Sequence, residues 1–209
     1  MTNRRKLRSK RGNTLVEFAL ISVLLVPLML GTVNVGLTLG RSIQTTQVSR
    51  DAGHMYVRQV DFSQTPNQKI IERIAEGLNF KLDGTGDGVV ILTKIQHIGT
   101  TECNSTNLNG APCSNLGKSV AIQRLVIGNK SLKQSDVAKP PENLILQPSG
   151  NIAPTDYLTK SQCVATGLPG VLNMQPGELA YVAESFFAAP SWSFPGSYPH
   201  TGSYARSIF

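Results

Sequence analysis

The stretch "RGNTLVEFALISVLLVPLMLG", residues 11–31, decides the fold because it is almost wholly apolar. The apolar run continues to Leu39, and Glu17 is the only charged residue between Arg11 and Arg41. About 20 predominantly apolar residues are enough to cross a bilayer as a helix. The sequence therefore predicts a membrane span over about residues 15–40, within a longer N-terminal helix over residues 13–60.

Charge is concentrated before this span. The formal net charge is +7, but the first eleven residues hold six of the 20 lysines and arginines and no acid. Removing these six leaves 14 bases against 13 acids, so the body is nearly neutral and lacks the basic footprint of a nucleic-acid-binding protein. Bases on one side of a span hold that side in the cytoplasm. We therefore expect a cytoplasmic leader (1–12), a single pass through the inner membrane and a periplasmic domain (61–209).

A cleaved secretory signal is the main alternative for this N-terminus. Its apolar core is only about 7–15 residues long and ends in a small-x-small cleavage site. The apolar stretch here is longer, and "LGTVNVG" is a poor version of such a site. The pattern favours an anchor that stays in the membrane.

Glu17 needs an explanation, because an acid costs roughly 2.5–3.5 kcal/mol at the centre of a membrane helix and less near its end. Gly12 lies five residues before it, and Phe18 follows it. This G-x-x-x-x-E-F spacing after a basic run resembles the prepilin signal of type IVb pilins. The continuation "VEFALISVLLVPLMLGTVNVG", with Pro27 midway, is similar to the TadE-like minor pilins of the tight-adherence (Tad) pilus machinery. The recognisable motif covers residues 11–55, with a weaker likeness in "AIQRLVIGN" and "YARSIF".

The resemblance implies that a prepilin peptidase cuts between Gly12 and Asn13, which makes Glu17 the fifth mature residue. It also implies that Glu17, with Phe18 beside it, serves assembly by pairing with the terminal amine of a neighbouring subunit. A paired charge in low dielectric costs less than a lone one. A helix N-terminal acid favoured by the macrodipole is the alternative, but it does not account for the glycine spacing.

The function implied by the resemblance is that of a structural minor pilin or pseudopilin, which contributes to pilus assembly and adhesion. The implied partners are a prepilin peptidase, a major pilin, other minor pilins and the inner-membrane Tad assembly platform. Assembly into an extracellular pilus would follow. The alternative is an unprocessed single-span protein whose exported domain binds a ligand or partner, and such an anchor needs neither Gly12 nor Glu17.

An exported α+β domain is predicted after the long helix. The segment 65–78 has the pattern of a short amphipathic helix with Ile70, Ile74 and Leu78 on one face. Residues 89–98, 119–127 and 178–187 are β-branched or aromatic-rich and predict strands. We expect an antiparallel sheet of three or four strands packed on the long helix, and the resemblance implies the same arrangement.

Three cysteines occur, and two of them bracket an Asn-Gly turn signal in "CNSTNLNGAPC". An exported pair at this separation can oxidise, so a Cys103–Cys113 disulfide is expected. Cys163 is then left over, and its pairing with either of the others is the alternative.

Chemistry-bearing patterns are otherwise weak. Asp83, Thr85 and Asp87 match the first, third and fifth positions of a calcium loop, but the twelfth position is Lys94 instead of glutamate. A plain turn before a strand is the favoured interpretation. The three histidines are scattered, and no zinc spacing or G-x-S-x-G motif is present. We therefore expect no enzymatic activity, no metal and no cofactor.

Overall fold

The computed structural model describes residues 13–108, 110–168, 170, 172–189 and 202–209. The chain divides into two compact units, residues 1–40 and residues 41–209. Helix α1 (Asn13–Val57) begins in the first unit and ends in the second. The expected α+β class, with a long apolar N-terminal helix and an antiparallel sheet, is confirmed.

The described part of the first unit is the apolar segment of α1, which continues through Pro27. Its large apolar side chains from Leu15 to Leu39 are all more than half exposed, between 51% and 72%. Ser22, Thr32 and Thr38 donate their hydroxyls to carbonyls of the same helix, which satisfies them internally. Among the described residues, α1 is the one helix long and apolar enough to cross a membrane.

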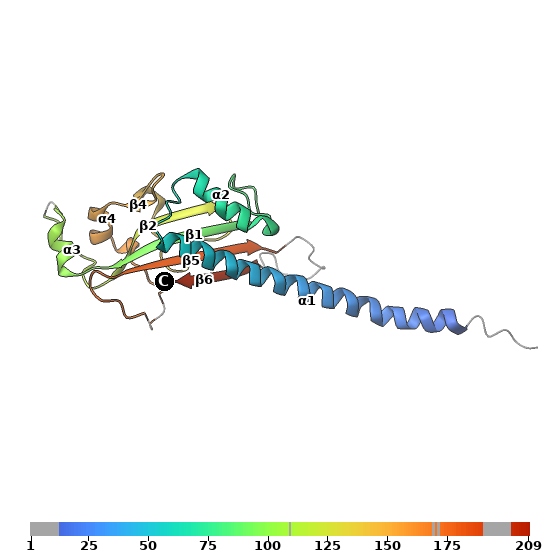
Figure 1. Cartoon of the computed structure of the whole chain (residues 1–209). Coiled ribbons are helices and arrows are strands. Elements are labelled where there is room, and N and C mark those ends of the chain that lie inside the picture. The colour runs from blue at the N-terminus through green and yellow to red at the C-terminus, as the bar shows by residue number, and fades with distance from the viewer. Residues whose placement is uncertain (1–12, 109, 169, 171, 190–201) are drawn as a thin grey trace, which may run out of the picture. The chain divides into compact units, whose positions relative to one another are not determined.

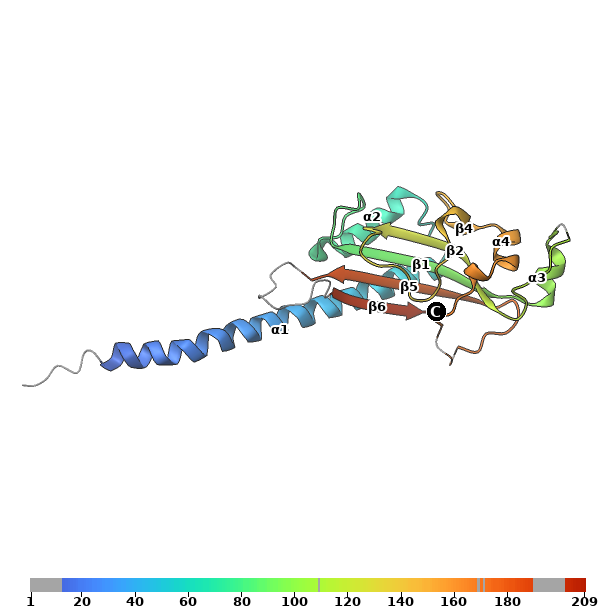
Figure 2. The same ribbon diagram turned by 180° about the vertical axis from the view of Figure 1, so that it is seen from behind.

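The second unit is built on a six-stranded antiparallel sheet in the order β3-β4-β2-β1-β5-β6 (Figures 1 and 2). The strands are β1 (Gly88–His97), β2 (Ser119–Gly128), β3 (Ile145–Leu146), β4 (Asn151–Ile152), β5 (Leu179–Ala188) and β6 (Gly202–Ile208). The three predicted strands correspond to β1, β2 and β5, each within one residue. The sheet is larger than the expected three or four strands, because β6 pairs along β5 and the two-residue strands β3 and β4 extend the other edge.

Helices cover one face of this sheet and irregular segments cover the other. The C-terminal part of α1 and α2 (Thr65–Ile74) lie on the first face, as Figure 1 shows. They close a core that contains Val48, Ala52, Tyr56, Phe62, Ile71, Leu92, Leu125, Ile127, Ala183 and Phe187. The opposite face has a smaller cluster of Ile95, Val137, Ala180 and Val182. The remaining short elements are η2 (Glu76–Leu78), α3 (Thr100–Ser105), η3 (Glu142–Leu144), α4 (Pro154–Thr159) and η4 (Ser161–Cys163).

The predicted apolar face of the second helix is wrong in part. Ile71, rather than Ile70, is buried in α2, and Ile70 and Ile74 remain 40% and 41% exposed. The α-helix ends at Ile74, and Leu78 is buried from the 3₁₀ turn η2. A 3₁₀ turn has three residues per turn instead of 3.6, so Leu78 no longer follows the phase of the helix before it.

Candidate processing and assembly site

The predicted processing site lies at the start of α1. Gly12 is outside the described residues, and Asn13 is the first residue of the helix. Glu17 lies one turn further on, since residues four apart are neighbours on a helix surface. Glu17 is exposed, and the Phe18 ring is 70% exposed. The fold thus presents both predicted assembly residues at the helix surface, one turn from the residue that would carry the new amine.

An apolar groove lies on the face of α1 that starts at Glu17 and runs toward the C-terminus of the helix. Ile21, Leu24 and Leu28 follow Glu17 at intervals of four, seven and eleven residues, which places them on one side. They line a shallow groove of about 500 Å³ together with Leu25, Met29 and Thr32. Further along, a Cβ added at Gly36 or Gly40 would meet nothing within 4 Å. These apolar side chains and both glycines are therefore uncovered by any other described part of the chain.

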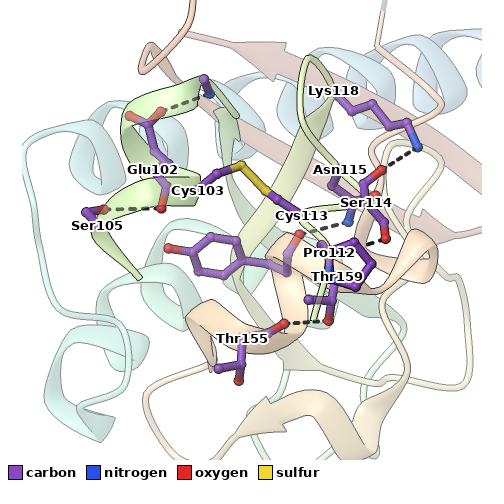
Figure 3. The surroundings of a disulfide bond; sticks show 12 residues. Glu102, Cys103, Ser105, Pro112, Cys113, Ser114, Asn115, Lys118, Thr155 and Thr159 are labelled. Atoms are coloured by element: carbon purple, nitrogen blue, oxygen red, sulfur yellow. Dashed lines mark hydrogen bonds between the residues drawn. A yellow bond between two sulfur atoms is a disulfide. The ribbon is translucent and has the colours of Figure 1, made fainter. Parts of the chain in front are cut away.

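A disulfide joins Cys103 in α3 to Cys113, with their Cα atoms 5.9 Å apart (Figure 3). Asn109 of the predicted turn is outside the described residues. Asn115, two residues after Cys113, also holds this loop in place. Its side-chain amide donates to the carbonyls of Tyr157 and Lys160 at 2.8 Å each. The bridge and these hydrogen bonds fix the loop against α4.

Cys163 is fully buried and is not part of a disulfide. It lies in the apolar cluster against which Cys103 and Cys113 also pack. Burial, with a smaller contribution from the Asp156 carboxylate, raises the pKa of its thiol to about 11. Because the thiolate is the nucleophile, the neutral thiol is a poor attacker of the neighbouring bridge at pH 7–8.

We expect a distinct alkylation pattern from this arrangement. Iodoacetamide at pH 8 should modify no cysteine in the folded, unreduced protein, because burial and a thiolate fraction lowered about 100-fold protect Cys163. Unfolding in guanidinium without reductant should expose Cys163 alone, and reduction should expose all three. Peptide mapping by mass spectrometry reads each step. A Cys163-containing bridge, or an alkylated Cys103 before reduction, would contradict the pairing.

The calcium-like loop makes turn contacts. The Asp83 carboxylate accepts hydrogen bonds from the backbone and hydroxyl of Thr85, and these bonds lower its pKa. The Asp87 carboxylate accepts the Asn79 amide at 2.8 Å. In the part of the chain that the structure describes, no three His, Cys, Asp or Glu side chains converge as metal ligands.

The two described histidines, His54 and His97, have different surroundings. The His54 ring lies 4.6 Å from the Phe209 ring, centroid to centroid. The Nδ1 atom of His97 lies 3.1 Å from the Ser119 hydroxyl. His200 is outside the described residues. The two described histidines thus have separate packing and hydrogen-bonding partners.

A buried carboxylate, Glu184, is the functional-looking group that the sequence analysis missed. It lies on β5 and is 2% exposed. Its oxygens accept hydrogen bonds from the Ser135 hydroxyl, the Asp136 N–H at 2.8 Å and the Tyr204 hydroxyl at 2.7 Å. Ser135 Oγ in turn accepts the N–H groups of residues 137 and 138. One carboxylate thus fixes the segment 135–138 on the sheet.

Two titratable side chains, Arg124 and Tyr204, interact with Glu184. Arg124 is the nearby cation: burial lowers the pKa of its guanidinium, and the charges of Glu184 and Glu142 oppose that shift. The pKa of Tyr204 is raised, first by burial and then by its hydrogen bond to Glu184. Tyr204 therefore stays a hydrogen-bond donor to the carboxylate. A single acid inside the apolar run "LAYVAESFF", residues 179–187, was the one available clue.

An apolar N-terminal helix that is long enough to cross a membrane leads into an α+β domain, and this arrangement fits a single-pass membrane protein. Residues 12–54 match the model of the family described as TadE-like protein. This match confirms the resemblance seen in the N-terminal motif and associates the chain with Tad pilus systems. It ends before the sheet, so it rests on the N-terminal helix. No curated protein and no solved structure matches the chain.

Proposed function

We propose that this chain is a structural minor pilin or pseudopilin of a Tad-type pilus or secretion apparatus. The observation that carries the proposal is the TadE-like match over residues 12–54, which includes the whole glycine-to-glutamate motif and the membrane-spanning segment. The role is one of contact between subunits rather than catalysis. The large second unit supports a minor subunit, because major pilins of this class are usually much shorter.

The proposed mechanism starts in the inner membrane, with the basic leader in the cytoplasm and the second unit in the periplasm. A prepilin peptidase removes residues 1–12 and creates an amine on Asn13. When the helix packs into a filament, the Glu17 carboxylate pairs with the terminal amine of a neighbouring subunit. Pairing in low dielectric removes the cost of two isolated charges.

Apolar packing supplies the rest of the contact. The groove lined by Ile21, Leu24 and Leu28 would receive the α1 helix of a neighbouring pilin. Helices in lipid associate through close van der Waals packing, to which an open groove and small residues such as Gly36 and Gly40 contribute. The proposed partners are therefore a major pilin, other minor pilins and the Tad assembly platform, besides the peptidase.

Gly12→Val is expected to block processing, because a branched side chain does not fit where the family uses glycine. N-terminal sequencing of the protein purified from its own host should find Asn13 in the wild type and the uncut leader in the variant. Gly31→Val is the matched control: it changes a glycine whose added Cβ meets nothing within 4 Å, and it should be cut normally. A wild-type chain that keeps Met1 would replace this proposal with the unprocessed anchor.

A further inference from the structure

The outer edge of strand β2 is only partly covered. On its inner side β2 pairs with β1 from Ser119 to Gly128. On its outer side β4 pairs with it at Gln123 alone, and the Arg124 N–H donates to the Gly150 carbonyl at 2.7 Å. Beyond Arg124, no backbone group among the described residues pairs with this edge. An unpaired edge is a template for one more strand.

The direction of the Val126 backbone follows from its neighbours. Successive residues of a strand direct their N–H and C=O groups to opposite edges of that strand. The backbone N–H of Arg124 is directed to the outer edge, where the Gly150 carbonyl accepts it. The Asn129 N–H instead donates inward, to the Gly88 carbonyl at 2.9 Å. Both observations place the N–H and C=O of Val126 on the outer edge, where they are available to a partner.

A groove of about 350 Å³ lies over this edge. It is lined by residues 124–127 of β2, by Ser63 and Gln68 from the α2 side, and by Glu142 and Pro148 from the β3 side. Its volume lies in the range of ligand sites, about 300–1,000 Å³. The walls therefore leave room for an extended chain beside Val126.

One positive charge that lines the groove has no ion-pair partner among the described residues. Arg124 is offset by Glu184 and Glu142, whose charges both act on its pKa. Lys130 also lines the groove, and no ion pair joins it to another described residue. Lys130 is therefore the uncompensated charge at one end of the open edge.

We propose that the outer edge of β2 is a docking site for an extended, acidic segment of a partner protein. The segment adds a strand beside Val126 through backbone hydrogen bonds, and its acidic side chain lies against Lys130. Main-chain pairing supplies affinity in this mode, and side-chain contacts supply specificity.

The test uses the full chain in detergent micelles and fluorescein-labelled pentapeptide mixtures. The central residue is Glu, Lys or Gln, and the four flanking positions vary among Val, Ile and Thr. Fluorescence anisotropy, corrected for empty micelles, should show the Glu mixture binding about two- to fivefold more tightly than the Lys mixture, the size of one exposed ion pair. Lys130→Glu should reverse that order. Lys139→Glu, an exposed lysine outside the groove, should leave it unchanged.

Val126→Pro removes the outward N–H at a position where an edge strand tolerates proline, so it should weaken binding of every mixture. Thermal unfolding of this variant checks that the sheet is intact, and Lys130→Glu is a surface change that leaves the fold unaffected. No saturable binding by any mixture, or binding unchanged by both variants, would overturn the proposal. Self-association that Val126→Pro abolishes, seen by sedimentation velocity, would assign the edge to a second copy instead. None of these results depends on processing at Gly12.

Discussion

Glu184→Leu is expected to lower the free energy of unfolding of the second unit by about 3–5 kcal/mol, because three hydrogen-bond donors lose their acceptor, at roughly 1–3 kcal/mol for each donor that stays buried. Leucine has a similar size but accepts no hydrogen bond. The hydroxyls of Ser135 and Tyr204 and the N–H of Asp136 would lose their acceptor inside the protein. Arg124 would lose one of the two charges that offset its burial. The segment 135–138 should then detach from the sheet.

Urea unfolding of the full chain in detergent, followed by circular dichroism of the sheet, measures this loss. Glu184→Gln keeps one acceptor oxygen without the charge and should cost less, about 1–3 kcal/mol. Glu76→Leu is the matched control, because Glu76 is an exposed acid in η2 and its removal should change stability by under 0.5 kcal/mol, as expected for a surface site. If Glu184→Leu were as stable as the control, the carboxylate would not hold the segment in place.

Glu17 and Glu184 show what the sequence could and could not reveal. Each is a single acid in an apolar run, so each had the same clue. Glu17 stood out because its run is long enough to cross a membrane and a glycine lies at a recognisable spacing. The partners of Glu184 are separated from it by 49, 48 and 20 residues. No local pattern could have brought them together.

Some strands could be predicted from the sequence, and others could not. β1, β2 and β5 were predictable because each is ten residues long and rich in β-branched or aromatic side chains. β3 and β4 have two residues each, too few to show any alternation. β6 contains Gly202, Ser203 and Ser207 and forms because β5 offers it an edge. Its existence depends on pairing rather than on its own composition.

The same limit applies to the Cys103–Cys113 loop and to the groove on β2. The spacing of Cys103 and Cys113 and the turn between them are local, so the bridge could be predicted. The docking of that loop through Asn115 onto residues 157 and 160 is not local. The groove on β2 depends on three separate segments, near residues 63–68, 124–130 and 142–148. Only the folded chain brings them together.

Glu17→Val should abolish assembly while leaving processing intact. Removing a charge from a membrane helix makes insertion easier, and the Gly12 cleavage position is unchanged. In the packed filament, however, the amine that would have paired with Glu17 is left alone in low dielectric. Breaking such a pair costs about 3–5 kcal/mol, so recovery in the assembled fraction should fall by about 100-fold or more. N-terminal sequencing and the amount of subunit in sheared or detergent-resistant filaments, measured on the same cells, separate the two steps.

Four further measurements make the test specific to the carboxylate. Glu17→Asp keeps the charge on a side chain one methylene shorter and should recover part of the assembly, whereas Glu17→Gln should not. Thr38→Val, which replaces a polar side chain of α1 outside the groove, should assemble as the wild type does. A Glu17→Val subunit still offers its own amine to a wild-type neighbour, so co-expression should give incorporation that rises with the share of wild-type chains. Normal assembly of Glu17→Val on its own would show that the acid does not pair, and the unprocessed anchor with a binding domain would then be the better account.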